Sequence, residues 1–148
     1  MKSLILCLIA SIGLFITARA QEVQKFEIKG NTHYGTKAIP EEILGLYKYE
    51  KDLEPIVEVN KDGTGFFQFH GTTKYPVEFW IETDENGNLI KYENEENSNY
   101  RTFLILKYGS NGEPVQGVDI VGTYDRIRLS MSYSLGYAII LGERFRKL

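Results

Sequence analysis

The sequence is poor in the residues that build covalent and metal-bound sites. It has one cysteine and two histidines in 148 residues. The cysteine, Cys7, lies in an N-terminal segment that we expect to be cleaved, so the rest of the chain can form no disulfide and no thiolate metal site. His33 and His70 lie far apart in the sequence, whereas zinc needs three or four ligands and usually a closely spaced pair. We therefore predict no metal site and no cofactor.

The motifs of the common enzyme classes are missing too. The sequence contains no G-x-S-x-G elbow, no P-loop and no dinucleotide-binding glycine pattern. Carboxylates do occur in pairs such as Glu78 and Glu82, but acids at alternate positions of a strand are typical of a solvated face. The formal net charge of -3 leaves no basic excess for a phosphate backbone. The sequence thus argues against nucleic-acid binding. It also ranks a hydrolase or isomerase below two non-enzymatic hypotheses, a small-molecule-binding protein and an interaction module.

The first twenty residues have the pattern of a signal peptide. Met1 and Lys2 give a positive start, residues 4–16 are almost wholly apolar, and Ala18-Arg19-Ala20 matches the A-x-A cleavage pattern. The apolar run of thirteen residues is shorter than the ~20 that a membrane-spanning helix needs. We therefore predict cleavage before Gln21, a single domain at residues 21–148, no membrane span, and a periplasmic or secreted location.

The rest of the chain consists of short apolar runs separated by turn signals. Asp62-Gly63 and Asn86-Gly87 are predicted hairpin turns. Such runs at this spacing predict an antiparallel barrel or sandwich. Pro40 followed by two acids predicts a short helix over residues 39–47. The predicted strands cover residues 23–28, 53–59, 64–70, 77–83, 88–93, 100–108, 118–121, 124–133 and 137–146, and residues after 28 are expected to form a polar loop.

The alternation of side chains predicts which face of each strand is buried. Ile127, Leu129, Met131 and Tyr133 alternate with Arg126 and Arg128, so we expect the apolar set inside and the arginines outside. The same argument places Phe79 and Ile81 inside, with Glu78, Trp80 and Glu82 outside. The run at residues 103–106 is apolar at every position. We expect it to be covered on both sides, by a helix or by the N-terminal segment.

We predict an all-β fold, a single antiparallel up-and-down barrel of about eight strands with a short N-terminal helix; an open sandwich is the alternative. Barrels of this size hold one small ligand or are filled by side chains. The sequence is rich in aromatic residues, with ten Tyr, eight Phe and one Trp. The first functional hypothesis is therefore that an apolar or amphipathic small molecule binds inside the barrel. The predicted lining comprises Phe67, Phe69, Phe79, Ile81, Phe103, Ile105 and Leu129.

Aromatic residues can equally form ordinary core and cross-strand pairs. The second functional hypothesis is therefore an interaction module or periplasmic inhibitor, with an exposed aromatic patch and no small-molecule ligand. Trp80 distinguishes the two hypotheses, because an exposed indole would mark a contact site and an inward indole would line a cavity.

Two segments carry a resemblance to a known family. Gly45-Leu46-Tyr47 opens the strand-rich region, and Glu143-Arg144-Phe145-Arg146 ends it. The arrangement resembles the lipocalin-type barrels (calycins), in which G-x-W opens the first strand and a basic residue near the last strand packs over the aromatic ring. The resemblance implies that Arg144 or Arg146 lies over Tyr47, which here replaces Trp. Asp62-Gly63-Thr64-Gly65, an aromatic strand and the second hairpin also resemble small exported proteins of Gram-negative bacteria of unknown function; that resemblance implies a location and no activity.

Overall fold

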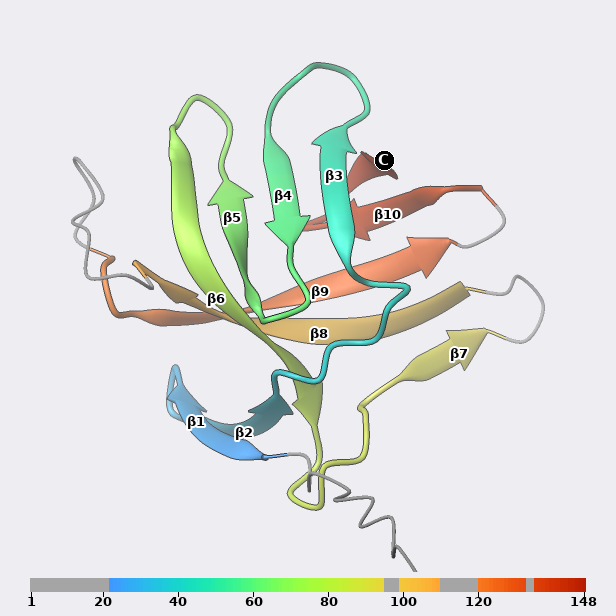
Figure 1. Ribbon diagram of the computed structural model, residues 1–148. Helices are drawn as coiled ribbons and strands as arrows, with labels where there is room; N and C mark the ends of the chain where they lie inside the picture. Colours follow the sequence, from blue (N-terminus) through green and yellow to red (C-terminus); the bar gives the residue numbers. More distant parts are fainter. Residues whose placement is uncertain (1–21, 95–98, 110–119, 133–134) are drawn as a thin grey trace, which may run out of the picture.

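The computed structural model describes residues 22–94, 99–109, 120–132 and 135–148, which contain eleven strands and no helix (Figure 1). None of these residues belongs to a helix long and apolar enough to cross a membrane. The predicted signal peptide, residues 118–119 of a predicted strand, and Tyr133 lie outside the described residues. The strands are β1 (Gln24–Ile28), β2 (Asn31–Thr36), β3 (Gly45–Tyr49), β4 (Ile56–Val59), β5 (Thr64–Gln68), β6 (Lys74–Thr83), β7 (Tyr92–Asn94), β8 (Asn99–Tyr108), β9 (Tyr124–Ser132), β10 (Tyr137–Ile140) and β11 (Glu143–Lys147).

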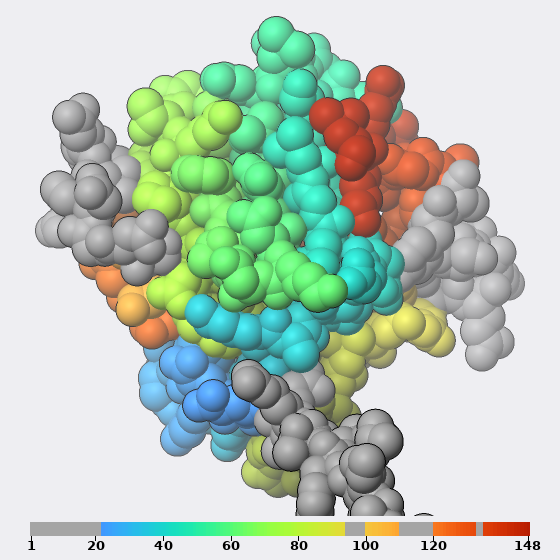
Figure 2. All heavy atoms as spheres, in the orientation of Figure 1, coloured from blue at the N-terminus to red at the C-terminus, as the bar shows by residue number. Residues whose placement is uncertain are grey.

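Eight of these strands form a closed antiparallel barrel, as predicted. Their order is β3-β4-β5-β6-β8-β9-β10-β11, and β11 pairs back with β3 to close the ring. Neighbours in the barrel are neighbours in the chain except that β7 intervenes between β6 and β8, so the topology is up-and-down. Figure 2 shows the C-terminal residues, in red, packed beside the teal residues of β3. Closure leaves none of the eight strands as a free edge along its full length.

The barrel interior is a continuous apolar core. Leu129 on β9, Phe79 on β6 and Leu104 on β8 are each at most 1% exposed, and they belong to one cluster. Ile127 and Met131 share this cluster with Leu129, and Arg128 on the opposite face is exposed. The predicted phase of β9 is therefore confirmed at the residues that the structure describes.

One end of the barrel is closed by a turn rather than by the predicted helix. Within residues 38–44 the amide of Ile43 donates to the carbonyl of Pro40 at 2.9 Å, and β3 begins at Gly45, so the segment completes only one turn. Ile43 is fully buried beneath the turn, and its carbonyl accepts the Tyr47 hydroxyl at 2.5 Å. The helix prediction is wrong because residues 45–49 pair on both sides, with β4 and β11, which satisfies the backbone as a strand.

The basic residue over the Tyr47 ring is Lys147, not Arg144 or Arg146. The Lys147 ammonium lies 5.9 Å from the ring centroid and donates to the Glu42 carbonyl at 2.6 Å. Burial at this closed end lowers the pKa of Lys147. Arg144 and Arg146 alternate with buried Phe145, so their side chains project from the outside of the barrel.

The predicted strand 88–93 is only an isolated bridge at Leu89 followed by β7, and turn positions account for further differences from the predicted strands. Gly63 and Gly87 adopt φ of 80° and 87° in the predicted hairpin turns, which confirms both. Leu141 and Gly142 also have positive φ and divide residues 137–146 into β10 and β11. The predicted loop after residue 28 is instead β2, reached through positive φ at Lys29 and Gly30, and residues 120–122 form a turn rather than a strand.

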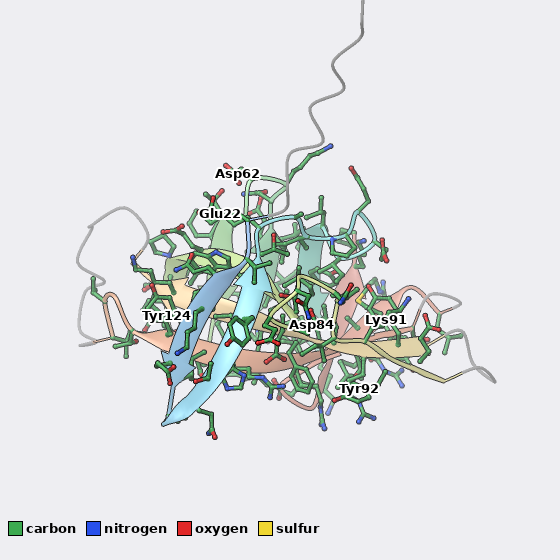
Figure 3. All side chains as sticks on the ribbon, turned by 90° about the horizontal axis from the view of Figure 1, so that it is seen from below. Glu22, Asp62, Asp84, Lys91, Tyr92 and Tyr124 are labelled. Carbon is green, nitrogen blue, oxygen red and sulfur yellow. The ribbon has the colours of Figure 1, made fainter. Side chains whose placement is uncertain are left out.

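The hairpin of β1 and β2 covers part of the outside of the barrel. β2 pairs with the end of β6, and Phe26 and Ile28 of β1 pack on Trp80 and Ile105 in a second buried cluster. Tyr124, labelled in Figure 3, borders the hairpin, with its ring centroid 5.4 Å from that of Phe26. The expectation that the N-terminal segment covers the second apolar face of β8 is therefore confirmed at Ile105, whereas Phe103 is half-buried against Arg126. Trp80 points outward, as predicted, yet the hairpin leaves it only 5% exposed.

Candidate functional site

Four of the seven predicted lining residues fill the barrel interior. Phe67, Phe79, Ile81 and Leu129 belong to the main core, and none is more than 2% exposed. Side chains around a ligand-sized cavity would retain accessible surface toward that cavity. These four instead pack against one another and their neighbours, as in an ordinary protein core.

The inward phase assigned to Phe103 and Ile105 is wrong. Phe103 is opposite Arg128, and Ile105 is opposite Arg126, in the β8–β9 register, and opposite residues of a pair share a face. Leu104 and Leu106 occupy the interior instead. The sequence could not decide the phase because both faces of β8 are apolar.

Phe69 follows the end of β5 and is 36% exposed. Its ring lies 5.0 Å from Phe67, 6.1 Å from Tyr75 and 6.4 Å from Tyr108. Phe69 therefore lies at the barrel end opposite the turn of residues 38–44. The neighbouring Tyr108 is buried, and this burial raises the pKa of its phenol.

The outer wall of β8 to β11 is rich in arginine. Every arginine among the described residues projects from it, and we define the arginine face as Arg101, Arg126, Arg128, Arg144 and Arg146. The inward neighbours of these residues on β8, β9 and β11 are buried, which fixes the arginines on the outside. Tyr137 and Ile139 of β10 are opposite Arg146 and Arg144 of β11 on one side and opposite Ser132 and Ser130 of β9 on the other.

Two of these arginines are held in place by the barrel. Arg126 donates from Nε at 2.9 Å and from Nη2 at 2.8 Å to the Glu82 carboxylate, and its guanidinium lies 3.4 Å from the centroid of the Phe103 ring. Glu82 is only 2% exposed, and His33 Nδ1 of β2 lies 2.7 Å from the same carboxylate. A buried carboxylate needs such partners, so Glu82 fixes both Arg126 and the N-terminal hairpin.

Arg144 is held in a similar way from the other side of the arginine face. Its guanidinium lies 4.3 Å from the centroid of the Tyr137 ring, and its Nε lies 3.4 Å from a Glu50 oxygen. Cation–π contact and a carboxylate together restrict the orientation of the guanidinium plane. Arg144 therefore presents its remaining donors in a fixed direction.

The other three arginines are available to an external partner. Arg101, Arg128 and Arg146 are exposed, and no carboxylate of the described residues lies within ion-pair distance of them. Tyr92 of β7, labelled in Figure 3, is opposite Arg101 in the strand register and is 60% exposed. The arginine face thus combines fixed guanidinium groups, unpaired guanidinium groups and exposed aromatic surface.

The described residues hold no arrangement suited to metal binding. No group of three or more His, Cys, Asp or Glu side chains gathers among them. His33 faces Glu82, and His70 Nε2 lies 2.8 Å from the Glu143 carboxylate. Each described histidine is therefore engaged by a single acid.

Comparisons with known proteins supply no further guide to this face. No protein-family model matches the chain, and neither a curated protein nor a solved structure matches it. The argument for function therefore rests on the geometry of the chain itself.

Sequence reasoning missed the arginine face as a unit. It predicted that Arg126 and Arg128 point outward, but it assigned Arg144 or Arg146 to the ring of Tyr47. The available signal was the i, i+2 spacing of arginines in two separate segments, which places each pair on one side of a strand. What the sequence could not show is that these two strands are separated only by β10.

Proposed function

We propose that this protein is an exported interaction module that docks an acidic segment of a partner protein on the arginine face. The carrying observation is that all the described arginines of a chain with net charge -3 lie on one wall of the barrel. A basic face on an acidic protein orients the approach of a negatively charged partner. The predicted signal peptide favours an extracytoplasmic place of action.

The choice of arginine over lysine favours a protein partner. Lysines are spread over the hairpin, both barrel ends and several strands, and Lys48 borders the arginine face opposite Arg146. Arginine and tyrosine are enriched in protein–protein interfaces, whereas lysine is depleted there. Phosphate groups and anionic lipids also attract arginine, so the binding test includes both as competing ligands.

The filled interior weighs against the rival hypothesis of an apolar carrier. Phe79 and Ile81 would have to move to admit a ligand, because they are 0% and 1% exposed. Displacing packed core side chains costs several kcal/mol per residue. An external docking surface requires no such rearrangement.

The test measures binding of a short fluorescent peptide of Glu, Asp and Tyr by anisotropy. The informative variant changes Arg101, Arg128 and Arg146 to Glu, because these arginines have no described acidic partner and their replacement should leave the fold intact. The matched control changes Lys25, Lys61 and Lys74 to Glu, which alters the net charge equally at exposed positions elsewhere. We expect the arginine variant to lose at least about tenfold in affinity, roughly 1.4 kcal/mol, and the lysine variant to lose much less.

Three outcomes would contradict the proposal. Equal losses in the two variants would reduce the effect to net charge, and tighter binding to phosphatidylglycerol vesicles or single-stranded DNA than to the peptide would assign the face to another polyanion. Saturable uptake of a fluorescent fatty acid, weakened by Phe79→Ala in a folded protein and unaffected by the arginine variant, would restore the carrier hypothesis.

A further inference from the structure

A hollow lies at the edge of the arginine face, where β3 ends and β11 begins. Its volume is about 300 Å³, and it is lined by Tyr49, Glu50, Lys51, Gly142, Glu143 and Arg144. The Glu50 amide donates to the Arg144 carbonyl at 3.0 Å, just beyond the last paired residues Tyr49 and Phe145. The hollow lies beside this last bond between the two segments, and residues 49–51 and 142–144 line it.

The hollow is lined by two acids and two cations, and one of the cations has no acidic partner among the described residues. Glu50 is engaged by Arg144 at 3.4 Å, and Glu143 is engaged by His70 at 2.8 Å. Lys51 is exposed, and no described carboxylate lies within ion-pair distance of its ammonium. Both acids therefore already have a hydrogen-bonding or ionic partner, whereas Lys51 and the remaining donors of Arg144 are available to an incoming anion.

The walls of the hollow are preorganised. Arg144 is stacked on Tyr137, and the Tyr49 ring makes edge contacts with His70 at 4.9 Å and a tilted contact with Phe145 at 5.9 Å. Gly142, at φ 85°, lacks a side chain, and a Cβ there would meet no atom within 4 Å. Space therefore lies beside fixed cationic and aromatic groups, and an occupant pays little to order them.

We infer that this hollow is the anchoring subsite of the docking surface and receives the carboxylate side chain of an Asp or Glu residue of the partner. The carboxylate binds between the Lys51 ammonium and the Arg144 guanidinium, and the rest of the acidic segment continues along the arginine face. The inference rests on the proposed function, because Arg144 belongs to both surfaces. A concave pocket at the edge of a convex barrel wall gives the partner a fixed register.

The side-chain assignment follows from the position of the hollow. A segment that crosses the arginine face continues in both directions from any one of its residues. A side-chain carboxylate can enter the hollow without ending the chain, whereas a terminal carboxylate can contribute only one end of the segment.

The test is an NMR titration of the 15N-labelled protein with N-acetyl-glutamate N′-methylamide. The glutamine analogue is the uncharged control, and N-acetyl-alanine presents a terminal carboxylate instead of an acidic side chain. The amide of Gly142 is the reporter, because it lies in the lining and glycine amides resonate in a distinct region. We expect a saturable shift of Gly142 with the glutamate analogue, little shift with the glutamine analogue, and weaker binding of N-acetyl-alanine.

Two lysine variants separate a specific contact from general attraction. Lys51→Gln should abolish saturation at Gly142, whereas Lys74→Gln, which removes an exposed charge outside the lining, should leave it unchanged. Equal responses to the glutamate and glutamine analogues, or equal effects of the two lysine variants, would overturn the inference. Stronger binding of N-acetyl-alanine would overturn the side-chain assignment.

Failure of this inference is distinguishable from failure of the proposed function. If the acidic peptide binds through Arg101, Arg128 and Arg146 while Lys51→Gln changes neither its affinity nor the Gly142 signal, the hollow is not the subsite. If the Gly142 shift saturates with the glutamate analogue but the arginine variant binds the acidic peptide as well as the wild type does, the hollow binds carboxylates and the proposed function is wrong.

Discussion

The outer wall of the barrel has two regions that face different surroundings. Beneath the N-terminal hairpin, the outward residues of β6 and β8 include Trp80 and Ile105, which are 5% and 0% exposed. Beyond the hairpin, the outward residues of β8, β9 and β11 include the five arginines. The strands run through both regions. The polarity of an outward side chain therefore depends on whether the hairpin covers it and not on which strand carries it.

Glu82 lies at the boundary between these regions. It accepts hydrogen bonds from Arg126 of the uncovered region, and it contacts His33 of the covering hairpin. One buried carboxylate thereby joins the hairpin to the barrel and orients one guanidinium of the arginine face. The comparison suggests that the hairpin makes a separable contribution to stability, which substitutions on the two sides of the wall can measure.

The largest expected effect is in the barrel interior. Phe79 is fully buried and Phe66, on the outside of β5, is 38% exposed. Phe79→Ala should lower the free energy of unfolding by about 3–5 kcal/mol through lost burial and the cavity left behind, and Phe66→Ala by roughly 1 kcal/mol or less. Urea titration followed by circular dichroism measures both. Similar losses in the two variants would contradict the inward and outward assignment.

The second effect is in the cluster beneath the hairpin. Phe26 is 4% exposed and lies 5.1 Å from the only tryptophan, Trp80. Phe26→Ala should cost about 3 kcal/mol and shift Trp80 emission to the red, because the hairpin loosens while the barrel stays folded. Lys25→Ala on the exposed side of the same strand is the control. Loss of far-ultraviolet ellipticity in step with the emission shift would show that hairpin and barrel unfold as one unit.

The same contrast explains what could be predicted from the sequence. On β9, arginines alternate with apolar residues, and the phase of Leu129 is therefore predictable. On β8, residues 103–106 are all apolar, because the inward pair lies in the core and the outward pair packs beneath the hairpin or against Arg126. The alternation that would reveal the phase is therefore absent. Of the covering hairpin, the sequence predicts β1 but not β2. Asn31 to Thr36 is mostly polar, and it forms a strand through its pairing with β1 and β6.

The candidate sites depended on contacts between segments distant in sequence. His33 and Glu82 lie close together because β2 pairs with the end of β6. The sequence could not predict this contact, because the residues between β1 and β3 were predicted to be a loop and a helix. The hollow beside Lys51 is lined in part by the turn at Gly142. The sequence did not reveal this turn, because residues 137–146 were predicted to be one continuous strand. Local periodicity identifies strands and faces, but it does not identify which strands become neighbours.

The third effect concerns the boundary residue. Glu82→Gln preserves the side-chain shape but removes the charge that Arg126 and His33 face, and we expect a loss of about 2 kcal/mol. Glu85→Gln, at an exposed position in the following turn, should change stability by less than about 0.5 kcal/mol. Denaturant titration of both variants measures the difference. Equal stability of Glu82→Gln and the wild type would show that the carboxylate does not join the two regions.

The smallest effect is expected at the turn that follows β6, outside both regions. Asp84 accepts hydrogen bonds from the Asn88 side chain at 2.7 Å and from the amides of Asn88 and Asn86 at 2.8 and 2.9 Å. The Asn88 side chain and these amides lower the pKa of Asp84 below its ordinary value. The stabilisation is therefore fully present above the ordinary aspartate pKa, and it is lost as the pH falls through the lowered pKa.

Asp84→Asn tests this pH dependence. The new amide oxygen can still accept from the backbone, but it carries no charge, and its NH2 group opposes the amide of Asn88. The variant should melt slightly below the wild type at neutral pH, and the gap should narrow as the pH falls toward about 3. Thermal unfolding across this range, with Glu85→Gln as the control for loss of an unpaired acid, measures the gap. A gap that stays constant with pH would assign the loss to turn geometry rather than to the carboxylate charge, and it would separate this turn from the charge-dependent boundary at Glu82.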